Sequence, residues 1–345
     1  MMSMRWIFIG AMAVLVAAAK VQSAAGQTPA TKQAWTPPRT VDGQPDLQGV
    51  WNNGTITPME RPPELADKAF FTEAEAAAYE KRVVENFNAD RRRGDVGADV
   101  AFAYNDAWWD RGTKVIKTRR TSMIVDPADG RLPPLTADGQ KRAAARAEQT
   151  KLHPADGPEN RLLSERCLQW PSAGPPMLPV AYNGNYQIFQ APGYVAIMIE
   201  MIHDVRIIPL DNRPHLPSIV RQWLGDSRGH WEGNTLVVET TNLIDKTQFP
   251  RQVSSTGSQT ANLPSTTGTM RLIERFTRTD PDTILYEFTV DDPAIYTKPW
   301  TAQLTMWKSE SRIFEYACHE GNYGMAGILA GARAEEKNPP KANQR

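Results

Sequence analysis

Eight short segments between residues 186 and 319 carry the pattern that most constrains the fold of this chain. They are rich in β-branched and aromatic residues, and apolar and polar side chains alternate in the clearest of them. In residues 283–291, Tyr286 and Phe288 fall on the face opposite Glu287 and Thr289. A two-residue period of this kind is typical of antiparallel strands that are buried on one face. The segments are 186–190, 194–202, 205–210, 235–242, 270–279, 283–291, 300–307 and 313–319.

Eight strands with short connections predict a mainly β fold. Turn residues at 191–193, 280–282 and 309–311 separate several of the strands. We expect an antiparallel eight-stranded barrel, because closure removes exposed strand edges and leaves an interior cavity. A two-sheet β-sandwich is the alternative. In the barrel, the long interruption at 211–228 would be a lid at one end.

The rest of the chain is expected to lead up to the barrel. Residues 26–71 are proline-bearing and predict an extended linker and lead-in. Residues 72–185 predict a loop-rich region with one or two helices, packed on the barrel. Thr72 and Glu75 form a capping box that opens a helix reaching about Arg92, and a second helix is expected at 136–152. The barrel domain would span 186–325, and 326–345 would be a polar C-terminal tail.

The N-terminus predicts export. Arg5 precedes an apolar stretch at 6–19, and small residues follow at 23–25, which is the layout of a signal peptide removed at about residue 25. The apolar run is too short for a membrane span, which needs roughly 20 residues. We expect a periplasmic or secreted protein without a membrane span after removal of residues 1–25.

The charge balance argues against a nucleic-acid partner. Residues 1–25 contain Arg5 and Lys20 and no acidic residue, so their removal leaves 37 Lys and Arg against 39 Asp and Glu, a net charge of −2. Such a chain has no basic field for nucleic acid. A small molecule is the expected partner, and the sequence does not define an oligomeric state.

The two cysteines, Cys167 and Cys318, could pair in an oxidising compartment. Closing a loop of about 150 residues would stabilise the fold by roughly 4–5 kcal/mol in the chain-entropy model. Two buried free thiols are the alternative. Their distance along the chain does not resemble a zinc or redox motif.

Four residues near strand ends are candidates for acid/base catalysis. No nucleophile elbow, zinc-protease helix or nucleotide-binding glycine loop is present. Glu200 lies in an apolar strand, where desolvation would raise its pKa and suit it to proton transfer. The other candidates are His203, His230 and His319. Each of the four could instead be structural. No metal ion and no cofactor are predicted.

A wider set of polar and aromatic side chains is predicted to bind the substrate. Tryptophans near loops could stack on a ring-bearing ligand or anchor the loops to the barrel, and charged residues around 226–232 could bind a carboxylate or form salt bridges. The set comprises Trp109, Arg111, Tyr186, Asp204, Arg206, Trp223, Asp226, Arg228, Trp231, Glu232, Tyr316 and Glu320.

Two resemblances accompany these patterns. The pair Gly49-x-Trp51 ahead of the strands is similar to the layout of lipocalin and calycin barrels. Several stretches resemble an uncharacterised family of exported proteins from environmental proteobacteria and acidobacteria. They are Trp-Trp-Asp-Arg-Gly at 108–112, Glu-Met-Ile-His-Asp at 200–204, the segment 223–233, and Tyr-Ala-Cys-His-Glu-Gly-Asn-Tyr-Gly at 316–324. The resemblance implies export and no particular activity.

Three functions remain open from the sequence. The first is binding of a small apolar or aromatic molecule in the barrel cavity, with or without acid/base chemistry of the isomerase, cyclase, hydratase or lyase type. The second is a non-catalytic binding or envelope-structural protein. The third is a secreted carbohydrate hydrolase with paired carboxylates such as Glu200 and Glu232.

Overall fold

The computed structural model describes residues 35–91, 106–246 and 267–338. Contacts divide the chain into two units, Met1–Trp35 and Thr36–Arg345, and all elements named here belong to the second. The predicted signal peptide, residues 1–25, and residues 339–345 of the predicted tail lie outside the described residues.

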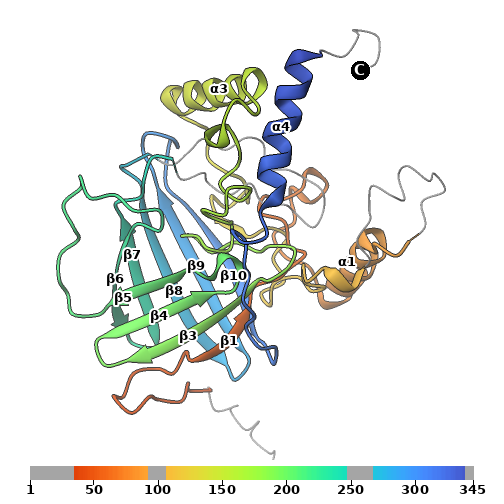
Figure 1. Ribbon diagram of the computed structural model, residues 1–345. Coiled ribbons are helices and arrows are strands. Elements are labelled where there is room, and N and C mark those ends of the chain that lie inside the picture. The colour runs from red at the N-terminus through yellow and green to blue at the C-terminus, as the bar shows by residue number, and fades with distance from the viewer. Residues whose placement is uncertain (1–34, 92–105, 247–266, 339–345) are drawn as a thin grey trace, which may run out of the picture. The chain divides into compact units, whose positions relative to one another are not determined.

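Nine antiparallel strands form a nearly closed barrel, in the order β5-β4-β3-β1-β10-β9-β8-β7-β6 (Figure 1). A short strand, β2, pairs with β10 outside this series. The strands are β1 (Gly49–Asn52), β2 (Ile124–Asp126), β3 (Asn185–Ala191), β4 (Tyr194–Ile199), β5 (Val205–Pro209), β6 (Asp226–Glu232), β7 (Thr235–Thr241), β8 (Arg271–Asp280), β9 (Thr283–Asp291) and β10 (Trp300–Lys308).

The seam of the barrel lies between β5 and β6. Within the described chain these two strands are in contact but share no ladder. All eight pairings in the series are antiparallel, so its two end strands must run in the same direction. Parallel neighbours need a long return connection, and residues 211–225 supply it. The predicted lid is therefore wrong: this segment, the strap, runs from one end of the barrel to the other.

The barrel prediction is confirmed, while the strand list needs three corrections. Seven predicted segments correspond to β3, β4, β5, β7, β8, β9 and β10. Residues 313–319, the eighth, form no strand. Strand β6 falls in a stretch expected to be loop. Strand β1 adds residues 49–52 to the barrel, which the predicted boundaries 186–325 leave out.

Large side chains and an inserted segment fill the barrel interior in the described part of the chain. Trp51, Tyr286 and Phe288 are fully buried within one apolar cluster. Residues 172–180, which we call the plug, are buried throughout. Within the plug, the Met177 N–H donates to the Tyr286 hydroxyl (3.0 Å), and its carbonyl accepts from the Asn53 amide (3.1 Å).

Among the described residues, three α-helices lie outside the barrel: α1 (Glu73–Phe87), α3 (Ala137–Leu152) and α4 (Tyr323–Lys337) (Figure 1). The capping box of Thr72 and Glu75 opens α1 as predicted, although the helix ends at Phe87, earlier than expected. Helix α3 matches the second predicted helix. Gly139 within it is explained by packing, because a Cβ there would lie 2.5 Å from the Ile295 carbonyl oxygen. Helix α4 occupies much of the predicted polar tail.

Four short 3-10 turns complete the described elements. They are η1 (Pro63–Leu65), η2 (Asp106–Trp108), η3 (Pro158–Asn160) and η4 (Met201–His203). The last of these shortens the predicted strand 194–202, because β4 ends at Ile199 and the chain turns at once into β5.

Candidate functional site

The predicted site residues lie in four places: the two ends of the barrel, its interior and its seam. The direction of each strand determines which end its terminal residues occupy. Glu200 and His203 lie in the turn from β4 to β5, at the end where the plug enters. Since β6 runs parallel to β5, Asp226 starts β6 at this plug end. Glu232, the last residue of β6, lies at the opposite end, where tight hairpins join the strands.

The residues of the hairpin end form a surface ion-pair group. His230 Nε2 lies 3.1 Å from Glu232 Oε1, and Arg275 donates to the other oxygen of Glu232 at 2.6 Å. Together with Trp231 they are separated from Glu200 by the length of the barrel. Glu200 and Glu232 therefore do not form the carboxylate pair that the hydrolase hypothesis requires.

Tyr186 and Arg206 point into the barrel interior. Arg206 donates to Glu274 (Nη1 to Oε1, 3.0 Å) and Tyr286 donates to the same oxygen (2.7 Å). The Tyr186 hydroxyl accepts from the Asn53 amide at 3.1 Å. These contacts join strands to each other and to the plug, so both residues hold the interior together.

Asp226, Arg228 and Trp223 belong to the seam. Arg228 Nη1 lies 2.7 Å from one oxygen of Asp226, and His215 Nδ1 lies 2.9 Å from the other. The second His215 nitrogen lies 3.5 Å from Glu239 of β7. The Trp223 carbonyl accepts from Gln169 at 3.3 Å. These contacts fasten the strap over the seam.

A relay of four polar side chains at the plug end links two carboxyl groups. The Asn52 amide donates to Asp110 Oδ2 (2.8 Å) and to Asn185 Oδ1 (3.1 Å), and the Asn185 amide donates to Glu200 Oε2 (2.6 Å). The other Glu200 oxygen accepts from the Phe314 N–H at 3.2 Å. Glu200 is buried, at 2% exposure, and holds its neighbours in place, whereas Asp110 is exposed.

The environment of Asp110 favours the neutral form of its carboxyl group. Desolvation by the surrounding protein raises the pKa of Asp110 above its ordinary value of 3.8, and the negative charge of Glu200 adds to that effect against the hydrogen bond from Asn52. A carboxyl group with a raised pKa beside a buried carboxylate is a recurring arrangement in acid/base catalysis. Asp110 is thus the better candidate for proton transfer.

A series of aromatic contacts runs from Trp109, the chain neighbour of Asp110, to Tyr316, two residues after the Phe314 that contacts Glu200. The Arg111 guanidinium lies 4.3 Å from the centre of the Trp109 ring, and Trp109 packs edge-on against Tyr182 at 6.2 Å. Tyr182 also contacts Trp170 at 6.1 Å and Tyr316 at 6.5 Å. The predicted binding residues Trp109, Arg111 and Tyr316 are therefore brought together with Glu200 at one place.

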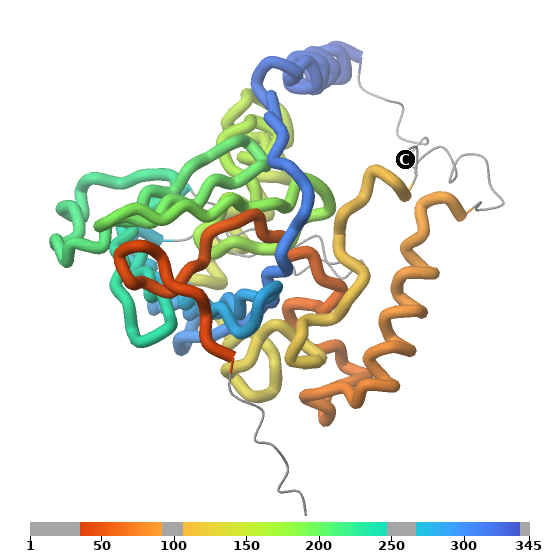
Figure 2. The backbone as a smooth tube through the Cα atoms, turned by 90° about the horizontal axis from the view of Figure 1, so that it is seen from below, coloured from red at the N-terminus to blue at the C-terminus, as the bar shows by residue number. Residues whose placement is uncertain are grey.

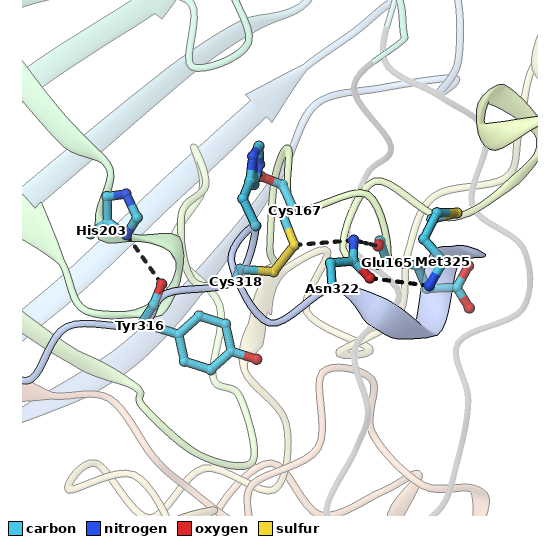
Figure 3. Close-up of a disulfide and its surroundings, with 8 residues drawn as sticks. Glu165, Cys167, His203, Tyr316, Cys318, Asn322 and Met325 are labelled. Carbon is cyan, nitrogen blue, oxygen red and sulfur yellow. Dashed lines mark hydrogen bonds between the residues drawn. A yellow bond between two sulfur atoms is a disulfide. The ribbon is translucent and has the colours of Figure 1, made fainter. Parts of the chain in front are cut away.

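The C-terminal segment before α4 is held against the plug end by a disulfide (Figure 3). Cys167 and Cys318 are bonded with a Cα–Cα distance of 5.7 Å, which confirms the predicted pairing. His203 Nδ1 donates to the Tyr316 carbonyl (3.1 Å), and His319 Nε2 donates to the Cys167 carbonyl (2.8 Å). Each histidine thus has one nitrogen engaged by the backbone.

The turn that carries His203 has an unusual backbone. Ile202 has a φ of 66° and His203 a φ of 48°, in the left-handed region that a β-branched residue rarely adopts. Such strain persists where the surrounding structure enforces it, often at functional sites. Next to them, burial raises the pKa of Asp204, against the charge of His203. Glu320, the last predicted binding residue, is exposed on the disulfide-held segment.

An open groove of about 610 Å³ adjoins the relay and reaches Asn52 and Asp110. One wall is α1 and the opposite wall includes Trp307 of β10, with residues 112–117 between them. Figure 2 shows α1, in orange, beside the yellow segment that contains these residues. The groove gives a ligand access to the exposed carboxyl group of Asp110.

Four functional candidates were not identified from the sequence. Asp110 stands between Trp109 and Arg111, two predicted binding residues, so the stretch 108–112 contains a signal that points to it. Asn52 and Asn185 carry no pattern that separates them from ordinary loop amides. His215 lies in a proline-bearing segment without periodicity, and only the return path of the strap brings it to Asp226.

The described residues contain no group of three or more His, Cys, Asp or Glu side chains placed to hold a metal ion. In the same ranges, no helix has the length and apolar character needed to cross a membrane. Comparison of the chain with protein-family models, with curated proteins and with solved structures found no match.

Proposed function

We propose that this is an exported protein that binds a small ring-bearing molecule in the groove that reaches Asn52 and Asp110, and exchanges a proton with it through Asp110. The reaction class is that of an isomerase, cyclase, hydratase or lyase, in which a side chain moves the proton. The observation that carries the proposal is the relay from Glu200 to Asp110, since it connects a buried carboxylate to an exposed carboxyl group of raised pKa beside the groove.

The binding site in this proposal is the groove rather than the barrel interior. The interior is filled by side chains and the plug, whereas the groove has a volume within the range of about 300–1,000 Å³ that small-molecule sites occupy. The disulfide supports an oxidising compartment and therefore export to the periplasm or beyond. We also propose a lipocalin-type barrel, because Gly49-x-Trp51 lies on a barrel strand.

A non-catalytic binding protein is the second candidate. This candidate is favoured because other predicted catalytic residues already make structural contacts. Glu200 bonds to Asn185 and Phe314, and His203 and His319 each bond to a carbonyl oxygen. In that case the groove binds a ligand and Asp110 contributes only a hydrogen bond.

Thermal unfolding against a ligand panel tests the proposal. The panel contains aromatic acids, phenols, sugars, lipids and divalent metals. A ligand at 100 times its Kd stabilises a protein by about 2.7 kcal/mol, which corresponds to roughly 5 °C for a chain of this size. Ligands that raise the melting temperature are then incubated with the protein, and conversion is followed by mass spectrometry and by proton exchange in deuterated water.

Asp110→Asn is the decisive variant, because asparagine can still accept the hydrogen bond from Asn52 while it cannot exchange a proton. We expect this variant to lose turnover and Glu232→Gln, at the hairpin end, to retain it. Equal turnover in the wild type and Asp110→Asn would exclude Asp110 as the proton-transfer group. Binding without turnover in the wild type would favour the non-catalytic candidate.

A further inference from the structure

The groove has three surfaces of different chemistry. Glu73, Ala76, Ala77 and Glu80 of α1 line one wall, at the spacing that places residues on one face of a helix. Because alanine side chains are small, the middle of this wall does not project into the groove. Trp307, half-buried on β10, contributes an aromatic surface opposite.

The charged groups that line the groove balance one another. They are Glu73, Glu80 and Asp110 against Lys114, Lys117 and Arg119. Lys114 Nζ lies 3.2 Å from Glu80, and Arg119 Nη1 lies 3.9 Å from Glu73. Lys117 pairs with Asp280 and donates to Thr283 at 3.0 Å. Because each cation already faces a carboxylate, an anionic ligand would have to displace an existing partner.

These features select a ligand with a stacking face and many neutral hydrogen-bonding groups. A sugar ring meets both requirements, since its C–H face packs on an aromatic ring and its hydroxyl groups bond to carboxylates, amides and ammonium groups at the edges. Trp307 supplies the ring, with Lys117 Nζ 6.0 Å from its centre. Asn52 and Asp110 at one end of the groove supply the amide and carboxyl groups.

We infer that the groove binds a neutral saccharide of two or three rings, stacked on Trp307 and hydrogen-bonded at Asp110. This inference rests on the proposed function and names the class of its ring-bearing ligand. The volume of about 610 Å³ accommodates a short oligosaccharide better than a single ring, and the open form of the groove lets a longer chain extend beyond it.

Calorimetric titration with matched sugars tests the inference. The panel pairs neutral disaccharides and trisaccharides of glucose, galactose and mannose with their uronic-acid and amino-sugar counterparts, and adds aromatic acids as ligands without hydroxyl-rich rings. We expect at least one neutral saccharide to bind at least tenfold more tightly than its charged counterparts. Trp307→Leu is expected to weaken that binding at least tenfold, and Trp307→Phe to restore part of it.

A pair of helix variants shows whether binding occurs in the groove. Ala77→Leu fills the groove from its wall, while Ala78→Leu adds the same volume to an exposed position of α1 that does not line the groove. Saccharide binding should disappear in Ala77→Leu and persist in Ala78→Leu.

The outcomes separate this inference from the proposed function. A charged sugar or an aromatic acid that binds more tightly than neutral saccharides, and is blocked by Ala77→Leu, would overturn the saccharide assignment and leave the groove as the binding site. If no ligand binds in a manner sensitive to Ala77→Leu, the inference and the groove of the proposed function both fail.

Discussion

Arg206 and Glu274 form an ion pair inside the barrel, with side-chain exposures of 1% and 0%. Arg206 comes from β5 at the seam and Glu274 from β8, on the other side of β6 and β7. The pair is extended by Ser227, whose hydroxyl accepts from Arg206 at 3.3 Å, and by Tyr286. Burial, and then the nearby charge of Glu274, raise the pKa of Tyr286 well above its ordinary value, so it remains a protonated donor.

The first prediction is that the fold is destabilised when one partner of this pair is replaced and the other remains. Arg206→Met or Glu274→Gln should lower the free energy of unfolding by about 3–5 kcal/mol, because each leaves the remaining polar group buried without its partner. The double variant should lose clearly less than the sum of the single losses. Urea unfolding of the four proteins measures this coupling. Arg275→Met, which breaks a surface pair with Glu232, is the control and should cost less than about 1 kcal/mol.

The second prediction concerns Gly229 on β6, where the barrel closes without a ladder. A Cβ at this position would lie 2.7 Å from Leu210 Cδ2 and 2.8 Å from Ile208 Cγ2, both from the β5 side of the seam. Gly229→Ala should therefore cost about 1–3 kcal/mol, as overpacking does, and Gly229→Val more. The control is Gly327→Ala on α4, where a Cβ meets nothing within 4 Å and helix propensity should rise. A neutral Gly229→Val would show that the seam is loosely packed.

Alternation predicted the longer strands with large interior side chains, and missed one strand whose interior side chains are small and one that is very short. Strand β9 places Ile284, Tyr286 and Phe288 inside, and its pattern is clear. In β6 the buried positions include Ser227 and Gly229, so the apolar half of the pattern is nearly absent. Strand β1 has only four residues, too few for a period to show. Residues 313–319 contain suitable side chains but pair with no strand.

Part of the candidate site was predictable residue by residue, but Asp110 and the arrangement of the site were not. Glu200, Trp109 and Tyr316 stood out as polar or aromatic residues at element boundaries, and the structure brings them together from three distant segments. His230 and Glu232 stood out for the same reason, yet they lie at the other end of the barrel. Their position depends on the direction of β6. That direction follows from the odd number of strands in the barrel, which no local sequence pattern reveals.

The third prediction is a pH dependence of stability that originates at Asp110. Its folded-state pKa is raised, so the folded protein binds the proton more tightly than the unfolded chain, and the stabilisation present below pH 3.8 is lost as the pH rises through the folded-state pKa. Asp110→Asn removes this loss, and its stability relative to wild type should increase from pH 4 to pH 7. Because Asp110 is exposed, the change should stay below about 1 kcal/mol.

Urea unfolding of both proteins at several pH values measures the difference directly. Comparison of the two proteins cancels the contributions of other carboxyl groups, among them Asp204, whose pKa is also raised, and Glu239, whose pKa is lowered by Arg271. A difference between the proteins that does not change with pH would contradict the raised pKa of Asp110.

The fourth prediction is that the disulfide holds α4 as well as stabilising the whole fold. The bond closes a sequence separation of 151 residues, for which the chain-entropy model gives about 5 kcal/mol. Helix α4 has no buried residue, and the contacts that hold it include that of the Asn322 amide with the Glu165 carbonyl at 2.8 Å (Figure 3). Without the disulfide, the order of the helix depends on its remaining contacts, none of which involves a fully buried residue of α4.

Replacement of both cysteines by serine should therefore have a global and a local effect. The free energy of unfolding should fall by about 3–5 kcal/mol, and amide hydrogen exchange in residues 323–337 should accelerate more than in the barrel strands. Asn322→Ala keeps the disulfide and removes the helix cap, so it separates the effect of the disulfide from that of Asn322. This variant should accelerate exchange only in the first turn of α4. If α4 exchanged equally in the oxidised protein and the double serine variant, its order would depend on contacts other than the disulfide.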